Sequence, residues 1–319
     1  MPASLEPALI HRPVLVDEVV RLLVTRPDGV YIDGTVGAGG HAEAILKRLA
    51  EMSGELNRLS RGRILGIDRD PQILDLARQR FEGIEGSRVH FLHASFEDMD
   101  RATSLLGVEQ VDGLVLDLGV SSLQLDQAQR GFSFSKEAYL DMRMDPNERT
   151  TAAEIVAKSS PHELMRILRD YGEERFAARI VENIVEARRR KRIETTTELA
   201  KIVAGSIPRA AISRRIHPVA RIHPATKTFQ ALRIAVNREL DRLDRFLKIA
   251  PSYVTVGGRI AVISYHSLED RLVKQAFHGG EREGLLRRLT KKPIRPTDAE
   301  VLGNPRSRSA RLRVAEKLE

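Results

Sequence analysis

Apolar residues in the first third of the chain form two alternating patterns. Short runs rich in Val, Ile and Leu are typical of buried strands and recur at Val30–Asp33, Arg63–Asp68, Arg88–His93 and Val111–Asp117. Segments with helical spacing lie between them, near His41–Ala50, Pro71–Phe81 and Phe96–Leu106. This alternation predicts a parallel sheet with helices on both faces and ligand-binding residues at the carboxyl ends of the strands.

The alternation stops after Asp117 and resumes much later. From about residue 125 to residue 219 the pattern is helical, without a convincing strand. The later segments read as a long helix, a strand, a helix and a strand, at Thr226–Leu247, Gly258–Ser264, Leu268–Phe277 and Arg311–Ala315. A lone strand after Gly257 needs a sheet to join, which favours one interrupted α/β domain over two sequential domains. We expect that domain over residues 1–124 and 223–319, with a helical insertion over 125–222.

Composition narrows the class of protein. The chain has 319 residues, of which 42% are hydrophobic and 30% are charged, as in soluble globular proteins. Because it has no cysteine, disulfides, thiolate zinc sites and cysteine nucleophiles are excluded. Neither a signal-peptide pattern nor a membrane-length apolar run is present, so we expect a cytoplasmic protein without a membrane partner.

The positive charge is concentrated in two segments. The formal net charge is +8. Residues Glu186–Arg221 hold ten Lys or Arg against three acids, a net of +7, and Arg282–Glu319 hold eleven against five, a net of +6. The remainder of the chain is therefore acidic, at −5. This segregation favours binding to RNA or DNA, although a run such as Arg188–Arg192 is also typical of a solvated helix face.

A glycine-rich loop follows the first predicted strand. Its sequence runs Asp33-Gly34-Thr35-Val36-Gly37-Ala38-Gly39-Gly40-His41. Glycines before a helix start allow backbone to approach a ligand, and the free N–H groups of the helix face it. The carboxylate of Asp33 would repel a phosphate and attract a cationic amine. The loop therefore favours S-adenosylmethionine, which carries an ammonium and a sulfonium, over a dinucleotide.

Two further carboxylates, Asp68 and Asp117, stand at strand ends. An acid after the second strand serves ribose hydroxyls in both NAD and S-adenosylmethionine sites, and Gly37-x-Gly39-x-x-Ala42 also fits the loose dinucleotide fingerprint. The long gap to Asp68, and a second carboxylate at the same sheet edge as Asp33, favour the methyl donor. The alternatives are a capping role for Asp33 and a helix N-cap role for Asp68 ahead of Pro71.

Ordered motifs along nearly the whole chain resemble one family. They are Val14–Val19, Asp33–His41, Ile67–Pro71, Asp117–Asp126, Arg130–Phe134, Leu140–Asp145, Tyr171–Phe176, His223–Thr226, Thr228–Ile234, Ile263–Arg271 and Asn304–Ser309. The chain resembles the bacterial 16S ribosomal RNA cytosine-N4 methyltransferases, also called ribosomal small-subunit methyltransferase H or MraW. The segment Ile212–Ile222 looks longer than usual for that family, and the stretch between Phe277 and Lys292 looks shorter.

The resemblance implies a fold, a cofactor and a set of contacts. The fold would be a class I, Rossmann-like methyltransferase fold with an inserted all-helical domain that recognises rRNA. The substrate would be a cytidine in the decoding region of 16S rRNA, cytosine 1402, within the small subunit. The expected S-adenosylmethionine contacts are Asp33, Gly37, Gly39, Gly40, His41, Asp68, Phe96, Asp117 and Gln124. Phe96 would lie at the adenine, or it is a core phenylalanine at a helix start.

Candidate catalytic residues follow from the chemistry of cytosine N4. Its lone pair is delocalised into the ring, so an acceptor for the amine protons and in-line positioning would help the transfer. Asp117, Ser121 and His266 lie after predicted strands at the ligand edge and are our candidates. The alternatives are turn-forming for Ser121 and helix-capping for His266. No residue set has the geometry of a metal site, so no metal is expected.

The sequence also indicates how an RNA substrate would be bound, and it leaves two other functions open. A target cytidine must be unstacked, and four rings could stack on it: Phe132, Phe134, Tyr139 and Tyr265. With few aromatic residues, the two basic segments should supply most of the affinity. The alternatives are a DNA amino-methyltransferase and a non-catalytic RNA-binding assembly factor. The sequence does not distinguish a monomer from a homodimer.

Overall fold

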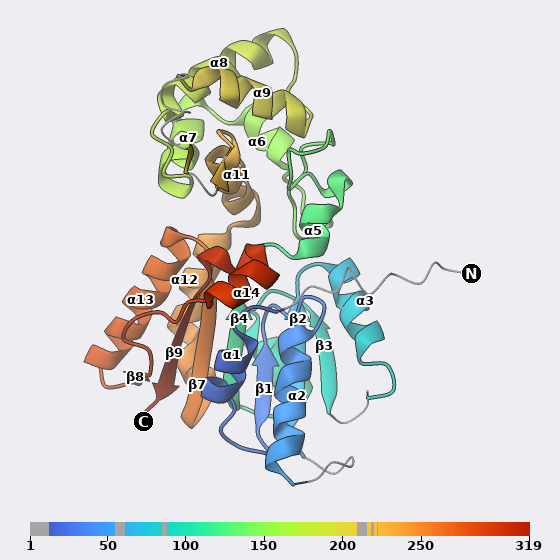
Figure 1. Cartoon of the computed structure of the whole chain (residues 1–319), viewed down its shortest axis with the longest axis vertical. Helices are drawn as coiled ribbons and strands as arrows, with labels where there is room; N and C mark the ends of the chain where they lie inside the picture. Colours follow the sequence, from blue (N-terminus) through green and yellow to red (C-terminus); the bar gives the residue numbers. More distant parts are fainter. Residues whose placement is uncertain (1–12, 55–60, 85–87, 209–215, 218–219, 222) are drawn as a thin grey trace. The chain divides into compact units, whose positions relative to one another are not determined.

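The computed structural model describes residues 13–54, 61–84, 88–208, 216–217, 220–221 and 223–319. The chain forms two compact units. Figure 1 shows their helices and strands, coloured along the sequence from blue to red. The sheet unit comprises Met1–Gly119 and Leu240–Glu319, and the helical unit comprises Val120–Glu239. The helical unit extends beyond the predicted insertion, residues 125–222, at both ends. The assignment of those ranges as functional domains stays a prediction.

A seven-stranded sheet organises the sheet unit. Its order is β3 (Val89–His93), β2 (Arg63–Asp68), β1 (Val30–Asp33), β4 (Val111–Asp117), β7 (Val254–Ser264), β9 (Arg311–Lys317) and β8 (Leu286–Arg288). The first five strands are parallel, whereas β9 is antiparallel to both of its neighbours. The predicted parallel sheet is confirmed. The short strand β8 was not expected from the sequence, and β7 begins earlier than the predicted strand 258–264.

Helices cover both faces of this sheet. They are α1 (Val16–Leu23), α2 (Gly40–Met52), α3 (Pro71–Arg80), α4 (Met99–Leu106), α12 (Glu239–Ile249) and α13 (Ser267–Arg282). The short helix α14 (Asp298–Gly303) has no buried residue and lies between β8 and β9 in the chain. Adjacent residues of a strand point to opposite faces, so Tyr31 and Ile32 of β1 enter two different hydrophobic cores. Both side chains are at most 1% exposed. A sheet buried on both faces presents its strand ends as the natural place for a ligand.

The helical unit packs around a third core. Its elements are α5 (Ser122–Asp126), η2 (Ala128–Arg130), α6 (Ala152–Lys158), α7 (Pro161–Arg166), a π-helical turn (Ile167–Tyr171), α8 (Ala177–Arg190), α9 (Thr196–Ser206), β5 (Ile216–His217), β6 (Ala220–Arg221) and α11 (Thr226–Asn237). Threonine or serine side chains cap α6, α7 and α9 by accepting a hydrogen bond from the third helical residue. The expected helical character is confirmed, with the addition of the two-residue strands β5 and β6.

The predicted single helix 226–247 is wrong. The chain leaves the helical conformation at Arg238, where φ is 52°, and this residue separates α11 from α12. The fully buried Asn237 side chain accepts a 2.7 Å hydrogen bond from Met144 N and donates one of 2.8 Å to Met142 O. Tertiary hydrogen bonding therefore ends α11, although the apolar periodicity continues across the break.

Replacing Asn237 with Ala is expected to lower the free energy of unfolding by about 2–4 kcal/mol. The substitution leaves a buried N–H and a buried carbonyl without their partners, and it opens a small cavity. Urea denaturation followed by circular dichroism measures the change, with the exposed Asn147→Ala as the matched control. Equal stability of the two variants would contradict this role for Asn237.

No helix in the described part of the chain combines the length and apolarity needed to cross a bilayer.

Candidate active site

Three carboxylates stand at the ends of neighbouring strands, as the sequence predicts. Asp33 ends β1, Asp68 ends β2 and Asp117 ends β4. In the sheet register, Asp33 is level with Gly66 of β2 and Val115 of β4. Because β1 lies between the other two strands, the three acids share one sheet edge. Their mutual repulsion makes this edge a favourable place for a cation.

Asp33 is the most deeply buried of the three. Its residue is 1% exposed, and Oδ1 accepts a 3.2 Å hydrogen bond from the N–H of Thr35. Oδ2 is buried and has no hydrogen-bond partner among the described residues. Burial, and then the charges of Asp117 and Asp68, raise the pKa of Asp33 to about 8. The turn backbone therefore occupies one oxygen, and within the described part of the chain the other oxygen is left without a donor.

Backbone conformation and close packing both require glycine in the loop after β1. Gly37 and Gly39 have φ of 55° and 85°, in the region that favours glycine. A Cβ on Gly39 would lie 2.6 Å from the ring of Phe81, and one on Gly40 would lie 2.7 Å from Pro13. The helix α2 begins at Gly40, so its first N–H groups lie directly after this turn.

Asp68 holds the loop and does not cap a helix. Its Oδ2 accepts a 3.0 Å hydrogen bond from Gly37 N, and its Oδ1 accepts one of 2.9 Å from Asp70 N. Asp70, not Asp68, is the N-cap of α3, and Pro71 occupies the first turn. The capping alternative for Asp68 is therefore wrong. Burial raises the pKa of Asp68 to about 6, with the nearby Asp70 charge adding to the shift.

Asp117 is fixed by two hydrogen bonds with side chains from other parts of the sheet unit, one donated and one accepted. Its backbone N–H donates to Oγ1 of Thr35 over 2.6 Å, and its Oδ1 accepts from the hydroxyl of Tyr265 over 2.8 Å. Tyr265 directly follows β7, the strand beside β4. The sequence suggested only a stacking role for this tyrosine. Its position after a neighbouring strand was the one signal that could have placed it beside Asp117.

His41 faces Asp117 as a neutral ring. Its Nε2 lies 3.0 Å from the carbonyl of Val14, which can only accept, so Nε2 carries the proton. Burial lowers the pKa of His41 to about 4. Nδ1 is then an acceptor, and it lies 3.8 Å from Oδ2 of Asp117. Two acceptors side by side suit an amine or ammonium that donates to both.

Phe96 lies in the hydrophobic core. It is 9% exposed, and its ring meets that of Phe246 edge-to-face at 5.5 Å between centroids. Its Cβ also lies close to Gly34, where an added Cβ would approach it to 3.0 Å. Phe96 therefore packs as a core phenylalanine, which was the alternative to an adenine contact. An additional contact with adenine stays a prediction.

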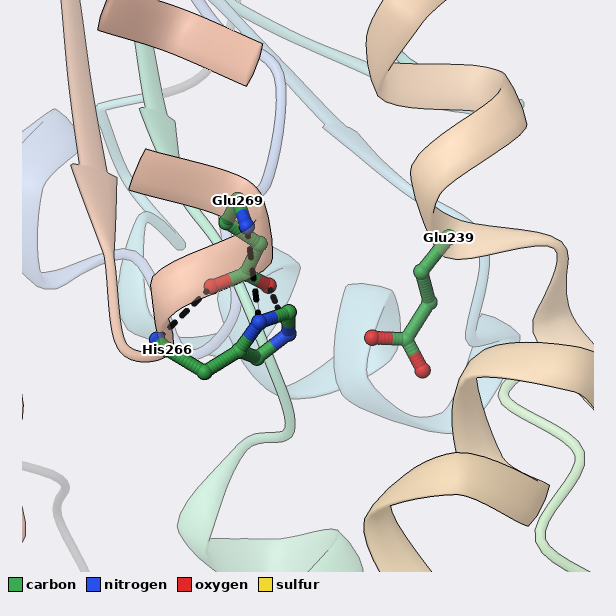
Figure 2. Close-up of side chains that lie close together, drawn as sticks. All are labelled: Glu239, His266 and Glu269. Carbon is green, nitrogen blue, oxygen red and sulfur yellow. Dashed lines mark hydrogen bonds and ion pairs between the residues drawn. The ribbon is translucent and has the colours of Figure 1, made fainter. Parts of the chain in front are cut away.

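His266 forms a capping box at the start of α13 (Figure 2). Its Nδ1 accepts a 3.4 Å hydrogen bond from Glu269 N, and the Glu269 carboxylate accepts from the backbone N–H groups of Tyr265 and His266 at 2.9 and 3.3 Å. Glu239, also drawn in Figure 2, belongs to the helical unit, where it makes a bidentate pair with Arg233. The capping alternative describes His266, and its catalytic role stays a prediction.

Ser121 and Gln124 form a second capping box, at the start of α5. Gln124 N donates to Oγ of Ser121 over 3.2 Å, and Ser121 N donates to Oε1 of Gln124 over 3.1 Å. Both residues belong to the helical unit, whereas the carboxylates belong to the sheet unit. Their predicted roles at the cofactor and the base stay predictions, as does the expectation that no metal takes part.

Comparisons with known proteins agree on one family. The family model described as the MraW methylase family matches residues 8–318. A relative from Pelobacter propionicus, named ribosomal RNA small subunit methyltransferase H, is 47% identical over 97% of this chain and 98% of its own length. A relative of the same name from a Cyanothece species is 47% identical over 100% of this chain and 98% of its own.

Solved structures were also compared. The structure of an rRNA methylase from Streptococcus thermophilus covers 99% of this chain and 100% of its own, with a TM-score of 0.38 and 13% identity. The family assignment rests on the sequence matches, which span nearly the whole chain. The chain therefore belongs to the MraW methylase family, and its mixed α/β sheet with an inserted helical unit is a class I S-adenosylmethionine-dependent methyltransferase fold.

Proposed function

We propose that this protein methylates the exocyclic N4 of a cytidine in the decoding region of 16S rRNA, cytosine 1402, with S-adenosylmethionine as donor. The observation that carries the proposal is the near-full-length similarity to proteins named ribosomal RNA small subunit methyltransferase H. The buried Oδ2 of Asp33, which has no partner among the described residues, supports it independently, because a buried carboxylate oxygen favours a cationic donor.

The residues at the sheet edge fit the methionine end of the donor. The ammonium would bind the free Oδ2 of Asp33, and Gly39, Gly40 and His41 would line this end of the pocket. Side chains at Gly39 and Gly40 would collide with Phe81 and Pro13, so the loop stays close to the protein and leaves its outer side to the ligand. S-adenosylmethionine supplies an electrophilic methyl group on a sulfonium.

The remaining contacts follow the strand order. Asp68, which already holds Gly37, has further lone pairs for the ribose hydroxyls. Phe96 follows β3 and would contact adenine with the part of its ring that the core leaves open. Gln124 stays a proposed cofactor contact, and its capping box with Ser121 fixes its side chain within the helical unit.

The chain's own contribution to methyl transfer is hydrogen bonding and positioning. An acceptor at the N4 amine raises electron density on nitrogen, and the carboxylate of Asp117 is suited to this because Tyr265 fixes its other oxygen. The neutral Nδ1 of His41 adds a second acceptor in the same place. Holding N4 in line with the methyl–sulfur bond lowers the activation barrier, and positioning of this kind contributes roughly several kcal/mol.

Among the described Phe and Tyr side chains of the helical unit, Tyr139 is the exposed one. Phe132 is 7% exposed, and Phe134 packs edge-to-face on Phe229 with 4.8 Å between centroids. Tyr139, by contrast, is 44% exposed. We propose Tyr139 as the ring of this unit that stacks on an unstacked base of the rRNA.

A three-substrate assay tests the function. Purified protein with S-adenosylmethionine labelled in its methyl group is offered small ribosomal subunits, naked 16S rRNA or duplex DNA, and modified nucleosides are identified by mass spectrometry. We expect N4-methylcytidine in ribosomal RNA. Methylation of DNA alone would support the DNA amino-methyltransferase, and donor binding without any transfer would support the non-catalytic assembly factor.

Two substitutions distinguish a capping role of the Ser121 side chain from a catalytic role of its hydroxyl. We expect Ser121→Ala to lower the stability of the protein by about 1 kcal/mol, because the N-cap is lost, and Ser121→Asn to restore it. If the cap is its main role, the Asn variant also methylates at close to the wild-type rate in single-turnover assays. A slow Asn variant with normal stability and RNA binding would instead assign the hydroxyl to catalysis.

A further inference from the structure

The segment 289–310, which links β8 to β9, runs to the sheet edge that holds the three carboxylates. Thr290 N donates to the carbonyl of Val314, and Ile294 bridges to Leu312, so the segment follows β9 backwards toward its first residue. That residue, Arg311, is level with Ser264 at the carboxyl end of β7. Figure 1 shows α14, which lies in this segment, beside the start of β9.

The same segment is anchored to the candidate site. Oε1 of Glu300, in α14, accepts a 2.8 Å hydrogen bond from Leu15 N. The preceding carbonyl, that of Val14, is the partner of His41. The charge of Glu300 also contributes to the raised pKa of Tyr265, after burial and the larger effect of Asp117. Segment 289–310 therefore contacts the backbone next to the residues that hold His41 in the candidate site.

The basic residues of the C-terminal region differ in their partners. Four arginines of the strands pair with carboxylates: Arg287 with Glu316, Arg288 with Glu281, and Arg311 and Arg313 with Asp270. A second group is exposed and makes no ion pair within the described part of the chain: Lys291, Lys292, Arg295 and Arg308. The acids of the segment are Asp298 and Glu300, and Glu300 is engaged with Leu15.

The other predicted basic region differs. In the run Arg188–Arg192, Arg190 pairs with Glu186, Lys191 pairs with Glu198 and Arg192 pairs with Glu194. Exposed pairs of this kind contribute only about 0–1 kcal/mol, so phosphates can still compete for these side chains. The local carboxylates nevertheless reduce the positive potential there. Residues 209–215 of that region lie outside the described residues.

We propose that segment 289–310 is an RNA-phosphate-binding rim at the cofactor edge of the sheet unit, with Lys291, Lys292, Arg295 and Arg308 as its phosphate contacts. The inference rests on the proposed function, since it identifies where the RNA backbone lies while a cytidine enters the site. Long, flexible cations suit this task, because phosphate contacts set the position and register of a nucleic acid without reading its sequence.

The test compares two triple variants with equal loss of charge. Lys291→Ala, Lys292→Ala and Arg295→Ala are combined in one protein. The control combines Lys47→Ala, Lys274→Ala and Arg282→Ala, which are exposed and lie on α2 and α13. Binding of each full-length protein to a labelled 16S rRNA fragment is measured from about 50 to 300 mM salt, and S-adenosylmethionine binding is measured by calorimetry.

We expect the rim variant to lose about 2 to 3 from the slope of log K against log salt, since each lost phosphate contact removes about 0.7–0.9. The control should change the slope by less than about 1, and both variants should bind S-adenosylmethionine like the wild type. Equal slopes for the rim and control variants would overturn the rim, even if the wild type methylates 16S rRNA. Failure of the wild type to methylate any RNA would overturn the proposed function instead.

Discussion

Replacing Asp33 with Asn is expected to weaken S-adenosylmethionine binding by at least about 100-fold. The buried Oδ2 has no partner among the described residues, and the variant removes the carboxyl group that would lose its proton and become the counter-charge of the ammonium. Loss of one member of a buried ion pair costs about 3–5 kcal/mol, and each 1.4 kcal/mol is tenfold in affinity. Calorimetric titration measures the change, with Asp75→Asn as the control, because Asp75 is an exposed acid of α3.

The same substitution should not destabilise the protein without its donor. Burial and two neighbouring acids disfavour the charged form of the Asp33 carboxyl, so a neutral amide of the same shape matches the form that the donor-free protein prefers. We expect the melting temperature of Asp33→Asn to equal or exceed that of the wild type. Unchanged donor affinity, or weak binding explained by a large fall in melting temperature, would contradict the assignment of Asp33.

The pH dependence of the protein's stability follows from the raised pKa of Asp33. Folding raises the pKa of Asp33 from 3.8 to about 8, so the folded chain holds this proton more tightly than the unfolded chain. The resulting stabilisation is complete below pH 3.8 and is lost as the pH rises through about 8. Asp68, with its pKa raised to about 6, acts in the same direction. Asp33→Asn should flatten this decline in denaturation curves measured between about pH 5 and 9.

Asp117→Asn is expected to slow methyl transfer by about 10- to 100-fold. The amide keeps the shape of the side chain but offers one acceptor without charge, and a hydrogen bond to a charged group contributes about 1.5–3 kcal/mol. Single-turnover rates at saturating S-adenosylmethionine isolate this effect from donor binding. A wild-type rate in the Asn variant would exclude Asp117 as an acceptor for the amine.

Tyr265→Phe provides the matched comparison. It removes the 2.8 Å hydrogen bond to Oδ1 of Asp117 and leaves the carboxylate in place. We expect a smaller decrease in rate, about 3- to 10-fold, because the carboxylate acceptor stays in place and only one hydrogen bond that orients it is lost. The decrease should vanish in the Asp117→Asn background if Tyr265 acts by positioning Asp117.

Strand ends and the glycine-rich loop were predictable because they depend on local patterns. The apolar runs of β1, β2 and β4 locate Asp33, Asp68 and Asp117 at one edge, since parallel strands end together. The break at Arg238 was not predictable, because Asn237 ends α11 through hydrogen bonds to residues more than ninety positions away in sequence. Apolar periodicity carries no information about such contacts.

Individual side-chain roles were harder to predict than positions. Ser121 and His266 were correctly placed after strands, yet both cap helices, because Ser and His side chains can serve a backbone N–H as readily as a substrate. Tyr265 gained its role from the neighbouring strand β4, which a one-dimensional pattern does not identify. Likewise, counting charges located the basic segments but did not distinguish paired arginines such as Arg313 from exposed Lys291.

The most direct test of the function is the modification state of 16S rRNA in cells without this gene. Mass spectrometry of the decoding-region fragment would be compared between the deletion strain, the strain complemented with the wild-type gene and the strain complemented with Asp33→Asn. We expect N4-methylcytidine to disappear on deletion, to return with the wild-type gene and not to return with the variant. Undiminished N4-methylcytidine in the deletion strain would contradict it.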